Sequence, residues 1–295
     1  MKELIDLHIH TTSSDGVLTP YEVIDEAKKN NVKTISITDH DTVSAYTNDL
    51  IEYAKENEIK LIPGIEISTK TKKCGIHILG YDIDIHNKEF LEKLEKIRNA
   101  RHDYLYNVSK KLKELGYIVN IEELDKIESV TKAHIALDII NNKENEKQLL
   151  KEFNDIPSKG QFIETLLNEG CPAYVKKESI TPKEASELIR KVNGKVVLAH
   201  PVAYYYEDNL TEEDIQALVD EISPDGIEAY YIYIDKNGVK HNDIEKWVKF
   251  SKKNKKEMTI GSDFHSFDNI HPVIGLLKED IDKEGKYYER IKRFI

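Results

Sequence analysis

The sequence predicts an α/β domain built on a parallel sheet, and three observations support this fold class. Short runs rich in Ile, Val and Leu alternate with amphipathic segments over residues 3–83, and the same rhythm returns after residue 180. Turn residues bound these runs, as is usual for strands. Several runs end in histidine or a carboxylate. Alternating strands and helices are typical of a parallel sheet, open or closed, and reactive residues at strand ends favour the closed barrel.

The first part of the pattern predicts four strands and two helices. The helix expected over 19–31 has Thr19 as its N-cap, Pro20 at its first position and Glu22 three residues after the cap, a combination that marks helix starts. A second helix is expected over 43–58. The predicted strands are residues 3–10, 33–40, 59–68 and 75–83.

The pattern continues after a long helical interruption. Residues 90–180 contain charged amphipathic helices and little that resembles a strand, so we expect a helical insertion that covers the active site. The barrel itself would comprise residues 1–89 and 181–295. Its second part is expected to hold a helix over 181–194, with a Thr-Pro start and Gly194 as its stop, and strands over 195–201, 225–231 and 257–265.

Composition limits the classes of function. The formal net charge of -11 over 295 residues argues against an extended nucleic-acid-binding surface, although bound cations could still attract a small phosphorylated substrate. No apolar run approaches the roughly 20 residues that a membrane-spanning helix needs. The two cysteines are far apart in the sequence, so we expect a protein of the reducing cytoplasm that acts away from membranes.

Nine potential metal ligands lie nearly all at or beside the ends of the predicted strands, with His77 inside the fourth strand. His8 and His10 are two residues apart in one strand, so their side chains point to the same face. Imidazole and carboxylate groups bind manganese, iron and zinc, and nine ligands suit two or three ions. Each motif alone is compatible with ordinary core packing, but their joint placement predicts a metal site. The nine are His8, His10, Asp15, His40, Glu66, His77, His200, Asp263 and His265.

These motifs resemble those of the PHP (polymerase and histidinol phosphatase) family of metal-dependent phosphoesterases. The matching stretches are "DLHIHTTSSDG", "ITDHDT", "GIEIS", "IHILGY", "VVLAHP" and "GSDFH", in the family's order. The resemblance implies a distorted (β/α)7 TIM-like barrel with a trinuclear metal centre. The insertion, with "TKAHIA" and "CPAYV", resembles the stand-alone bacterial branch called TrpH-type, which acts on nucleoside 3',5'-bisphosphates and short RNA ends.

The resemblance also implies how the ligands are shared among the ions. Each set is carried over by position in the motifs. The three sets are His8, His10, Glu66 and Asp263; then Asp15, His40 and His265; then Glu66, His77 and His200, with Glu66 bridging.

The insertion should supply the substrate contacts. His134 matches a family histidine that faces the substrate, as a leaving-group acid or as a phosphate contact. This sequence departs from the family pattern Gly-Arg-Pro-His: it reads Thr-Lys-Ala-His, with Lys132 where arginine is usual. Lysine binds phosphate as a point charge rather than as a planar fork, so phosphate selection is expected to differ. Arg98 or Arg101 could provide an alternative clamp or could belong to a solvated helix face.

We therefore predict a metal-dependent phosphoesterase that hydrolyses phosphate from small nucleotides, either nucleoside 3',5'-bisphosphates or short 5'-phosphorylated oligoribonucleotides. The hypothesis is that a metal-bridging hydroxide attacks the phosphoester, and that Asp39 orients the neighbouring ligands without binding an ion itself. Two alternatives remain open: a histidinol-phosphate phosphatase, and a non-catalytic metal-binding PHP module. The ligand types do not choose among manganese, iron and zinc, and the oligomeric state is not predicted.

Overall fold

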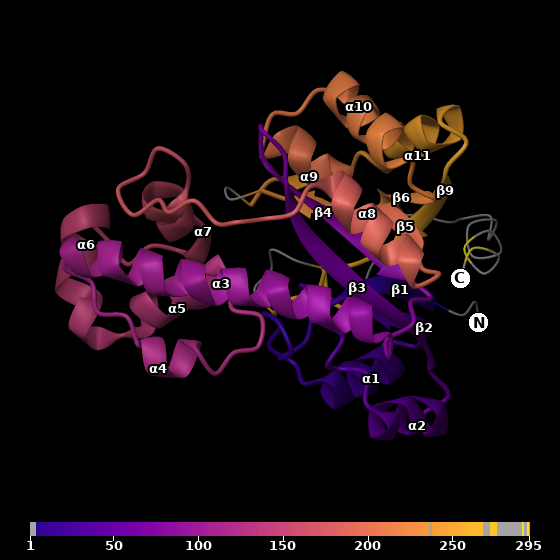
Figure 1. Ribbon diagram of the computed structural model, residues 1–295, viewed down its shortest axis with the longest axis horizontal. Helices are drawn as coiled ribbons and strands as arrows, with labels where there is room; N and C mark the ends of the chain where they lie inside the picture. Colours follow the sequence, from indigo (N-terminus) through magenta and orange to yellow (C-terminus); the bar gives the residue numbers. More distant parts are fainter. Residues whose placement is uncertain (1–3, 236–237, 268–271, 276–290, 292–293, 295) are drawn as a thin grey trace. The chain divides into compact units, whose positions relative to one another are not determined.

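The computed structural model describes residues 4–235, 238–267, 272–275, 291 and 294 (Figure 1). The chain divides into two compact units. The first comprises Met1–Glu92 and Ile180–Ile295, and the second is Lys93–Ser179.

The first unit is built on a seven-stranded sheet in the order β1-β2-β3-β4-β5-β6-β9. All seven predicted strands are present, with differences at their ends. The mixed α/β fold with a mainly parallel sheet is therefore confirmed. The strands are β1 (Leu4–Ile9), β2 (Val32–Ile37), β3 (Lys60–Lys70), β4 (Gly75–Tyr81), β5 (Lys195–Leu198), β6 (Gly226–Tyr230) and β9 (Glu257–Ile260).

One strand departs from the expected parallel arrangement. β4 is antiparallel to both of its neighbours, β3 and β5. Only residues 71–74 separate β3 from β4, and a parallel crossover needs a dozen or more residues. The short connection therefore reverses the chain, and the prediction that this strand is parallel was wrong.

Helices of the first unit begin where the cap signals predict. Thr19 and Glu22 form a capping box at α1, and Thr181 and Glu184 form one at α8. The predicted helix over 43–58 starts later than expected because Thr47 caps it. The bounds are α1 (Pro20–Lys29), α2 (Asn48–Glu56), α8 (Pro182–Lys191), α9 (Pro201–Tyr206), α10 (Glu212–Ile222) and α11 (Ile244–Lys253), together with the hairpin β7 (Tyr233–Ile234) and β8 (Lys240–His241).

The two ends of the strand order approach each other. Ile9 at the end of β1 forms a parallel bridge with Phe264, which follows β9. Asp6 reinforces this junction, since its buried carboxylate accepts the N–H groups of Ser262 and Gly275, both at 2.9 Å. Leu7 of β1 belongs to a buried core made largely of strand residues. The segment that follows β9 is thereby fixed alongside β1.

The second unit is helical and has its own core. Leu105 and Val108 of its long first helix are fully buried against Ile135, Ile139 and other apolar side chains. The elements are α3 (Lys88–Glu114), within which the boundary between the units falls, α4 (Ile121–Leu124), α5 (Lys132–Asn141), η1 (Lys143–Asn145), α6 (Glu146–Phe153), α7 (Lys159–Phe162) and η2 (Ile163–Leu167). Among the described residues of both units, no helix is long and apolar enough to cross a membrane.

Candidate metal centre

Strand β1 supplies the first two candidate ligands. His8 and His10 are both fully buried and alternate with the buried residues Leu7 and Ile9. Their Nε2 atoms lie 3.2 Å apart. The period of two in a strand thus brings both imidazoles to one point, as the sequence predicts.

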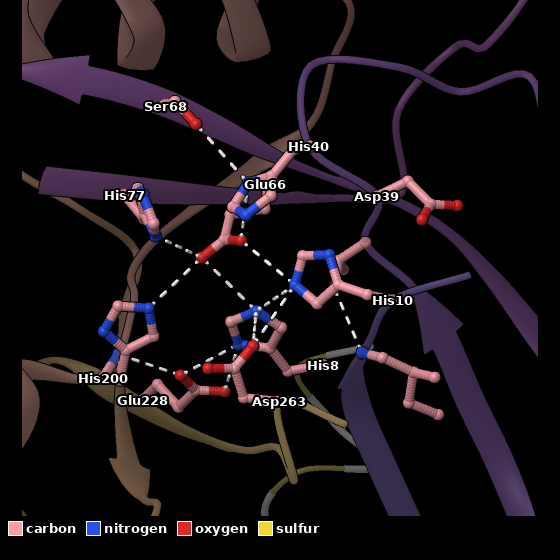
Figure 2. A network of polar contacts seen from close by, with 12 residues as sticks. His8, His10, Asp39, His40, Glu66, Ser68, His77, His200, Glu228 and Asp263 are labelled. Atoms are coloured by element: carbon pink, nitrogen blue, oxygen red, sulfur yellow. Dashed lines mark hydrogen bonds and ion pairs between the residues drawn. The ribbon is translucent and has the colours of Figure 1, made fainter. Parts of the chain in front are cut away.

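Glu66 of β3 lies at the centre of the cluster (Figure 2). Its carboxylate is almost fully buried and is surrounded by five imidazole rings. Such a carboxylate can bridge metal ions that its two oxygens face separately. Oε1 lies 3.3 Å from His8 Nε2, 3.0 Å from His77 Nδ1 and 3.3 Å from His200 Nε2, and Oε2 lies 3.2 Å from His10 Nε2 and 3.1 Å from His40 Nδ1.

Backbone pairing brings His40 to Glu66. The loop after β2 continues beside β3 and forms a parallel bridge between His40 and Glu66. The Asp41 N–H donates to the Glu66 carbonyl at 2.9 Å, and the Glu66 N–H donates to the Asp39 carbonyl at 3.3 Å. Asp41 has a positive φ of 55°. This conformation forms the turn that directly follows His40.

The segment after β9 brings in the last ligands. The Asp263 N–H donates to the His8 carbonyl at 2.8 Å, and the His10 N–H donates to the Phe264 carbonyl at 2.9 Å. Asp263 has φ of 53°, a strained conformation for a residue other than glycine, and such strain is concentrated at functional sites. His265 Nε2 lies 3.3 Å from Asp15 Oδ1. The loop after β1 and the segment after β9 therefore meet at one place.

Within the described residues, three groups of side chains could each hold an ion. The first two groups share His10, and the second and third share Glu66. The second group contains the same four residues that the resemblance assigns to one ion. His200 lies outside the three groups, but its Nε2 contacts Glu66. The groups are His10, Asp15, His40 and His265; His8, His10, Glu66 and Asp263; and His40, Glu66 and His77.

The spacing of the atoms suits metal coordination. Metal–ligand bonds of about 2.1 Å put neighbouring ligand atoms roughly 3.0 Å apart in an octahedron and roughly 3.4 Å apart in a tetrahedron. His8 Nε2 and His10 Nε2 lie 3.1 and 3.2 Å from Asp263 Oδ1. Among the described residues, Nδ1 of His200 is buried without a hydrogen-bond partner, and Oδ1 of Asp15 and of Asp263 face imidazole nitrogens of the same cluster. Buried atoms of this kind are what a cation would satisfy.

The pKa values of the cluster also indicate that its carboxylates attract positive charge. Burial lowers the pKa of His10, but hydrogen bonds to Asp263 and Glu66 outweigh it and raise that pKa to about 10. Burial raises the pKa of Glu66, but the neighbouring imidazoles, His77 first, hold it well below its usual range. His40 behaves in the opposite way, since burial holds its pKa well below the usual value. The carboxylates thus stay ionised and attract cations, whether protons or metal ions.

The carboxylate of Asp39 is buried and is linked to the ligand His10 through Ser14. Its carboxylate accepts from the Thr11 N–H and hydroxyl, both at 2.7 Å, and from the Ser14 hydroxyl at 2.6 Å. The Ser14 hydroxyl lies 3.3 Å from His10 Nδ1. Asp39 therefore anchors the loop that carries Asp15 and reaches His10 through Ser14.

Two further residues of the cluster, Glu228 within β6 and Tyr231 just after it, were not predicted from the sequence. Glu228 is fully buried, and its carboxylate oxygens lie 3.1 Å from His8 Nδ1. The Tyr231 hydroxyl donates to Asp263 Oδ2 at 3.0 Å. A single carboxylate inside the apolar run "GIEAYY" is a signal that could have found Glu228, because glutamate is almost never fully buried without partners.

The candidate substrate residues of the insertion lie around one segment of the second unit. Arg101 is buried, and its Nη1 donates to the Val130 carbonyl at 3.2 Å. Arg98 Nε lies 3.4 Å from Glu128 Oε1. Both arginines thus contact the chain just before α5, the helix on which the other two candidates are found.

The remaining two candidates lie in the first turn of α5. Lys132 Nζ donates to Asn168 Oδ1 at 2.9 Å. His134 completes a capping box: its backbone N–H donates to the Thr131 hydroxyl, and its Nδ1 accepts the Thr131 N–H at 3.1 Å. Because Nδ1 accepts a hydrogen bond, the proton of the neutral ring is on Nε2.

Comparison with known proteins decides the family. A model of the PHP domain matches residues 6–221. This chain belongs to the PHP family. The resemblance predicted from the motifs is therefore confirmed.

Several named relatives cover most of this PHP chain. The 5'-3' exoribonuclease Rnm of Escherichia coli (strain K12) is 33% identical over 220 residues, which is 73% of this chain and 70% of that protein. A 5'-3' exoribonuclease of Haemophilus influenzae is 31% identical over 271 residues, 90% of this chain and 91% of the other. The 3',5'-nucleoside bisphosphate phosphatase of Chromobacterium violaceum is 26% identical over 266 residues, 89% and 87% of the two chains.

Solved structures share the fold of this PHP chain. A protein from Bifidobacterium adolescentis, described as a metal-dependent phosphoesterase, superposes with a TM-score of 0.75 over 99% of this chain and 97% of its own, at 19% identity. An amidohydrolase from Chromobacterium violaceum gives a TM-score of 0.73 at 24% identity and covers 90% of this chain and 89% of its own. At these identities the likeness concerns the fold alone.

Proposed function

We propose that this protein is a metal-dependent phosphoesterase that hydrolyses phosphate esters of small nucleotides, either nucleoside 3',5'-bisphosphates or the 5' ends of short RNA. One observation carries the proposal: the imidazole and carboxylate groups predicted as ligands converge around the buried carboxylate of Glu66. The relatives named as exoribonucleases and as a bisphosphate phosphatase support the substrate class.

The nine candidate residues would hold two or three divalent ions, with manganese, iron and zinc all suited to the ligand types. Bound ions of this kind activate water and neutralise the charge of a phosphate group. The protein's own part is to keep the ligands in place. Glu66 would be a ligand shared by neighbouring ions, and Asp39 would anchor the loop that carries Asp15. The bridge from Ile9 to Phe264 supports closure of the seven strands into a distorted barrel around the centre.

We further propose that the helical insertion, residues 90–180, covers this centre and supplies the substrate contacts, while residues 1–89 and 181–295 form the barrel. Arg98, Arg101 and Lys132 would surround the phosphate with positive charge. The cap at α5 favours one of the two roles considered for His134. Its Nδ1 accepts the Thr131 N–H, so Nε2–H would be the ring's hydrogen-bond donor to phosphate.

Hydrolysis of a substrate panel by the metal-loaded protein tests the proposal. The panel contains adenosine 3',5'-bisphosphate, a short 5'-phosphorylated RNA and histidinol phosphate, and the metal content of each sample is measured. We expect at least one of the first two to be hydrolysed fastest and a chelator to abolish the activity. A preference for histidinol phosphate would contradict the substrate class. A protein that holds its metal and hydrolyses none of the three would indicate a non-catalytic binding module.

A further inference from the structure

Glu228 of β6 contacts the candidate ligand His8 on the edge of the ring that faces away from Glu66 (Figure 2). Its carboxylate is fully buried, and Oε1 and Oε2 each lie 3.1 Å from His8 Nδ1. Oε2 also accepts the backbone N–H of His200 at 2.9 Å. One side chain therefore contacts two candidate ligands without lying in any of the three candidate ion groups.

The contact with His8 determines which ring nitrogen keeps the lone pair that can bind a cation. A carboxylate accepts hydrogen bonds, so His8 Nδ1 must carry a proton. In the neutral ring this leaves the lone pair on Nε2. Nε2 is the atom that faces Glu66 Oε1 at 3.3 Å and Asp263 Oδ1 at 3.1 Å. Glu228 therefore both orients the ring and selects the tautomer that can bind a cation.

The contact with His200 stabilises an unusual backbone. His200 has φ of 20° and ψ of 62°, a sparsely populated conformation for a residue with a side chain. The hydrogen bond from its N–H to Glu228 Oε2 helps to hold that conformation at the start of α9. The His200 ring stacks at 5.7 Å from the ring of His8, so the two residues that Glu228 contacts are also neighbours of each other.

Gly261 packs directly against Glu228 and His8. A Cβ atom added to Gly261 would lie 2.3 Å from Glu228 Oε1 and 2.2 Å from His8 Cβ. Glycine at this position therefore lets the carboxylate and the imidazole lie against the backbone that leads from β9 to Asp263. The segment that carries Asp263 and the pair formed by Glu228 and His8 are packed as one structure.

We infer that Glu228 is a positioning residue of the metal centre: it fixes the Nε2-binding tautomer of His8 and the backbone of His200, and thereby sets the affinity for the ion held by His8. This inference rests on the proposed metal-binding function. Carboxylates that orient metal-binding histidines in this way typically change metal affinity or activity by about 10- to 100-fold when they are replaced.

The test compares metal binding by wild type, Glu228→Gln and Thr259→Val. Glutamine keeps the size of the side chain but offers only one acceptor oxygen for the two N–H groups that Glu228 accepts, those of the His8 ring and the His200 backbone. Thr259 pairs with Glu228 in the neighbouring strand, is equally buried, and its hydroxyl has no hydrogen-bond partner among the described residues. Its replacement therefore controls for disturbance of the strand pair. Affinity is measured by chelator competition, and the visible spectrum of the Co²⁺-loaded protein reports the ligand environment.

We expect Glu228→Gln to weaken the affinity for one ion by about 10- to 100-fold and to shift the Co²⁺ spectrum, while Thr259→Val matches wild type. Unchanged affinity and spectrum in Glu228→Gln would overturn the inference even if the variant unfolds at a lower temperature, since that would be a purely structural role. Glu228→Asp, which keeps the charge but is one methylene shorter, carries the same test if the glutamine variant does not fold.

The outcomes also separate this inference from the proposed function. A wild-type protein that binds the ions but hydrolyses none of the panel would overturn the proposed function and leave the positioning role to be decided by affinity and spectrum. A wild-type protein that binds no divalent ion would overturn both.

Discussion

The candidate ligands of the sheet and the candidate substrate residues of the insertion are held in different ways. His8 and His10 are fixed by a strand that is buried on both faces, and by contacts with residues more than fifty positions away in the sequence, such as Glu66 and Asp263. His134 is instead fixed by a residue three positions before it. The candidate metal centre is thus a product of tertiary structure, whereas the first turn of α5 is set by local capping.

This difference has a consequence for mutation. Removal of one ligand from the cluster disturbs several partners at once, because the buried charges compensate one another. Removal of a residue held by a local cap lowers the stability of that helix start and changes little else of the fold. The effects should therefore decrease from the centre of the cluster to the edge of the insertion.

The largest effect is expected for His10→Ala. His10 belongs to two of the three candidate ion groups, so its loss should lower the content of more than one ion. Because bound ions contribute several kcal/mol to catalysis of this kind, kcat should fall about a thousandfold or more. Metal analysis and steady-state kinetics on the same sample measure both quantities. His86→Ala is the matched control, since His86 is exposed and lies outside the groups. A His10→Ala protein with full metal content and full activity would contradict the assignment of the site.

The contrast between the two regions also explains what the sequence could and could not predict. Strand periodicity brought out His8 and His10, and the end of the last strand brought out Asp263, because a regular sheet converts sequence position into spatial position. Glu66 was found at the expected end of the third strand, but β3 continues to Lys70 and holds Glu66 inside it. Glu228 was missed because it lies within its predicted strand rather than at the strand end, although the lone carboxylate in the apolar run "GIEAYY" was a signal of it. The reversed direction of β4 was missed because alternating patterns say nothing of strand direction, although the short link over residues 71–74 carried that information.

A smaller effect is expected for His134. His134→Ala should keep its metal and lose about 100-fold in kcat, since a positioned hydrogen-bond donor or acid contributes on that scale. His134→Gln separates the two roles. Glutamine at this position of a capping box can still accept the Thr131 N–H and leaves an amide N–H as a donor. We expect it to recover most of the activity. If His134→Gln is as inactive as His134→Ala, proton donation to the leaving group is the role instead.

The pH dependence of stability should differ between the ion-free and the loaded protein. The pKa of His10 is raised from 6.5 to about 10, and that of His8 is also raised, against burial, by Glu228, Asp263 and Glu66. Protonation therefore stabilises the ion-free fold fully below pH 6.5, and this contribution is lost as the pH rises toward 10. Glu66, Asp15 and Asp263, whose pKa values are lowered, stay ionised throughout this window and add no slope.

Metal ions replace those protons, so the apparent metal affinity should rise by about tenfold per pH unit for each proton displaced. Thermal unfolding between pH 6.5 and 8.5, with chelator and with saturating metal, measures the effect. We expect the gap between the two melting temperatures to widen as the pH rises. An ion-free protein whose melting temperature increases over this range would show that the imidazoles are not the groups that hold the protons.

The smallest effect is expected at Lys132, where the family pattern has arginine. Lys132→Arg restores a planar fork that can bind two phosphate oxygens at once, so KM for a bisphosphate should fall by about three- to tenfold with kcat unchanged. Asn168 complicates this comparison because it accepts a hydrogen bond from the lysine and would compete with phosphate for the new group. Asn168→Ala combined with Lys132→Arg removes the competitor and should lower KM further. If neither variant changes KM, Lys132 acts only within its own unit, and recognition of phosphate must be assigned to the arginines of α3.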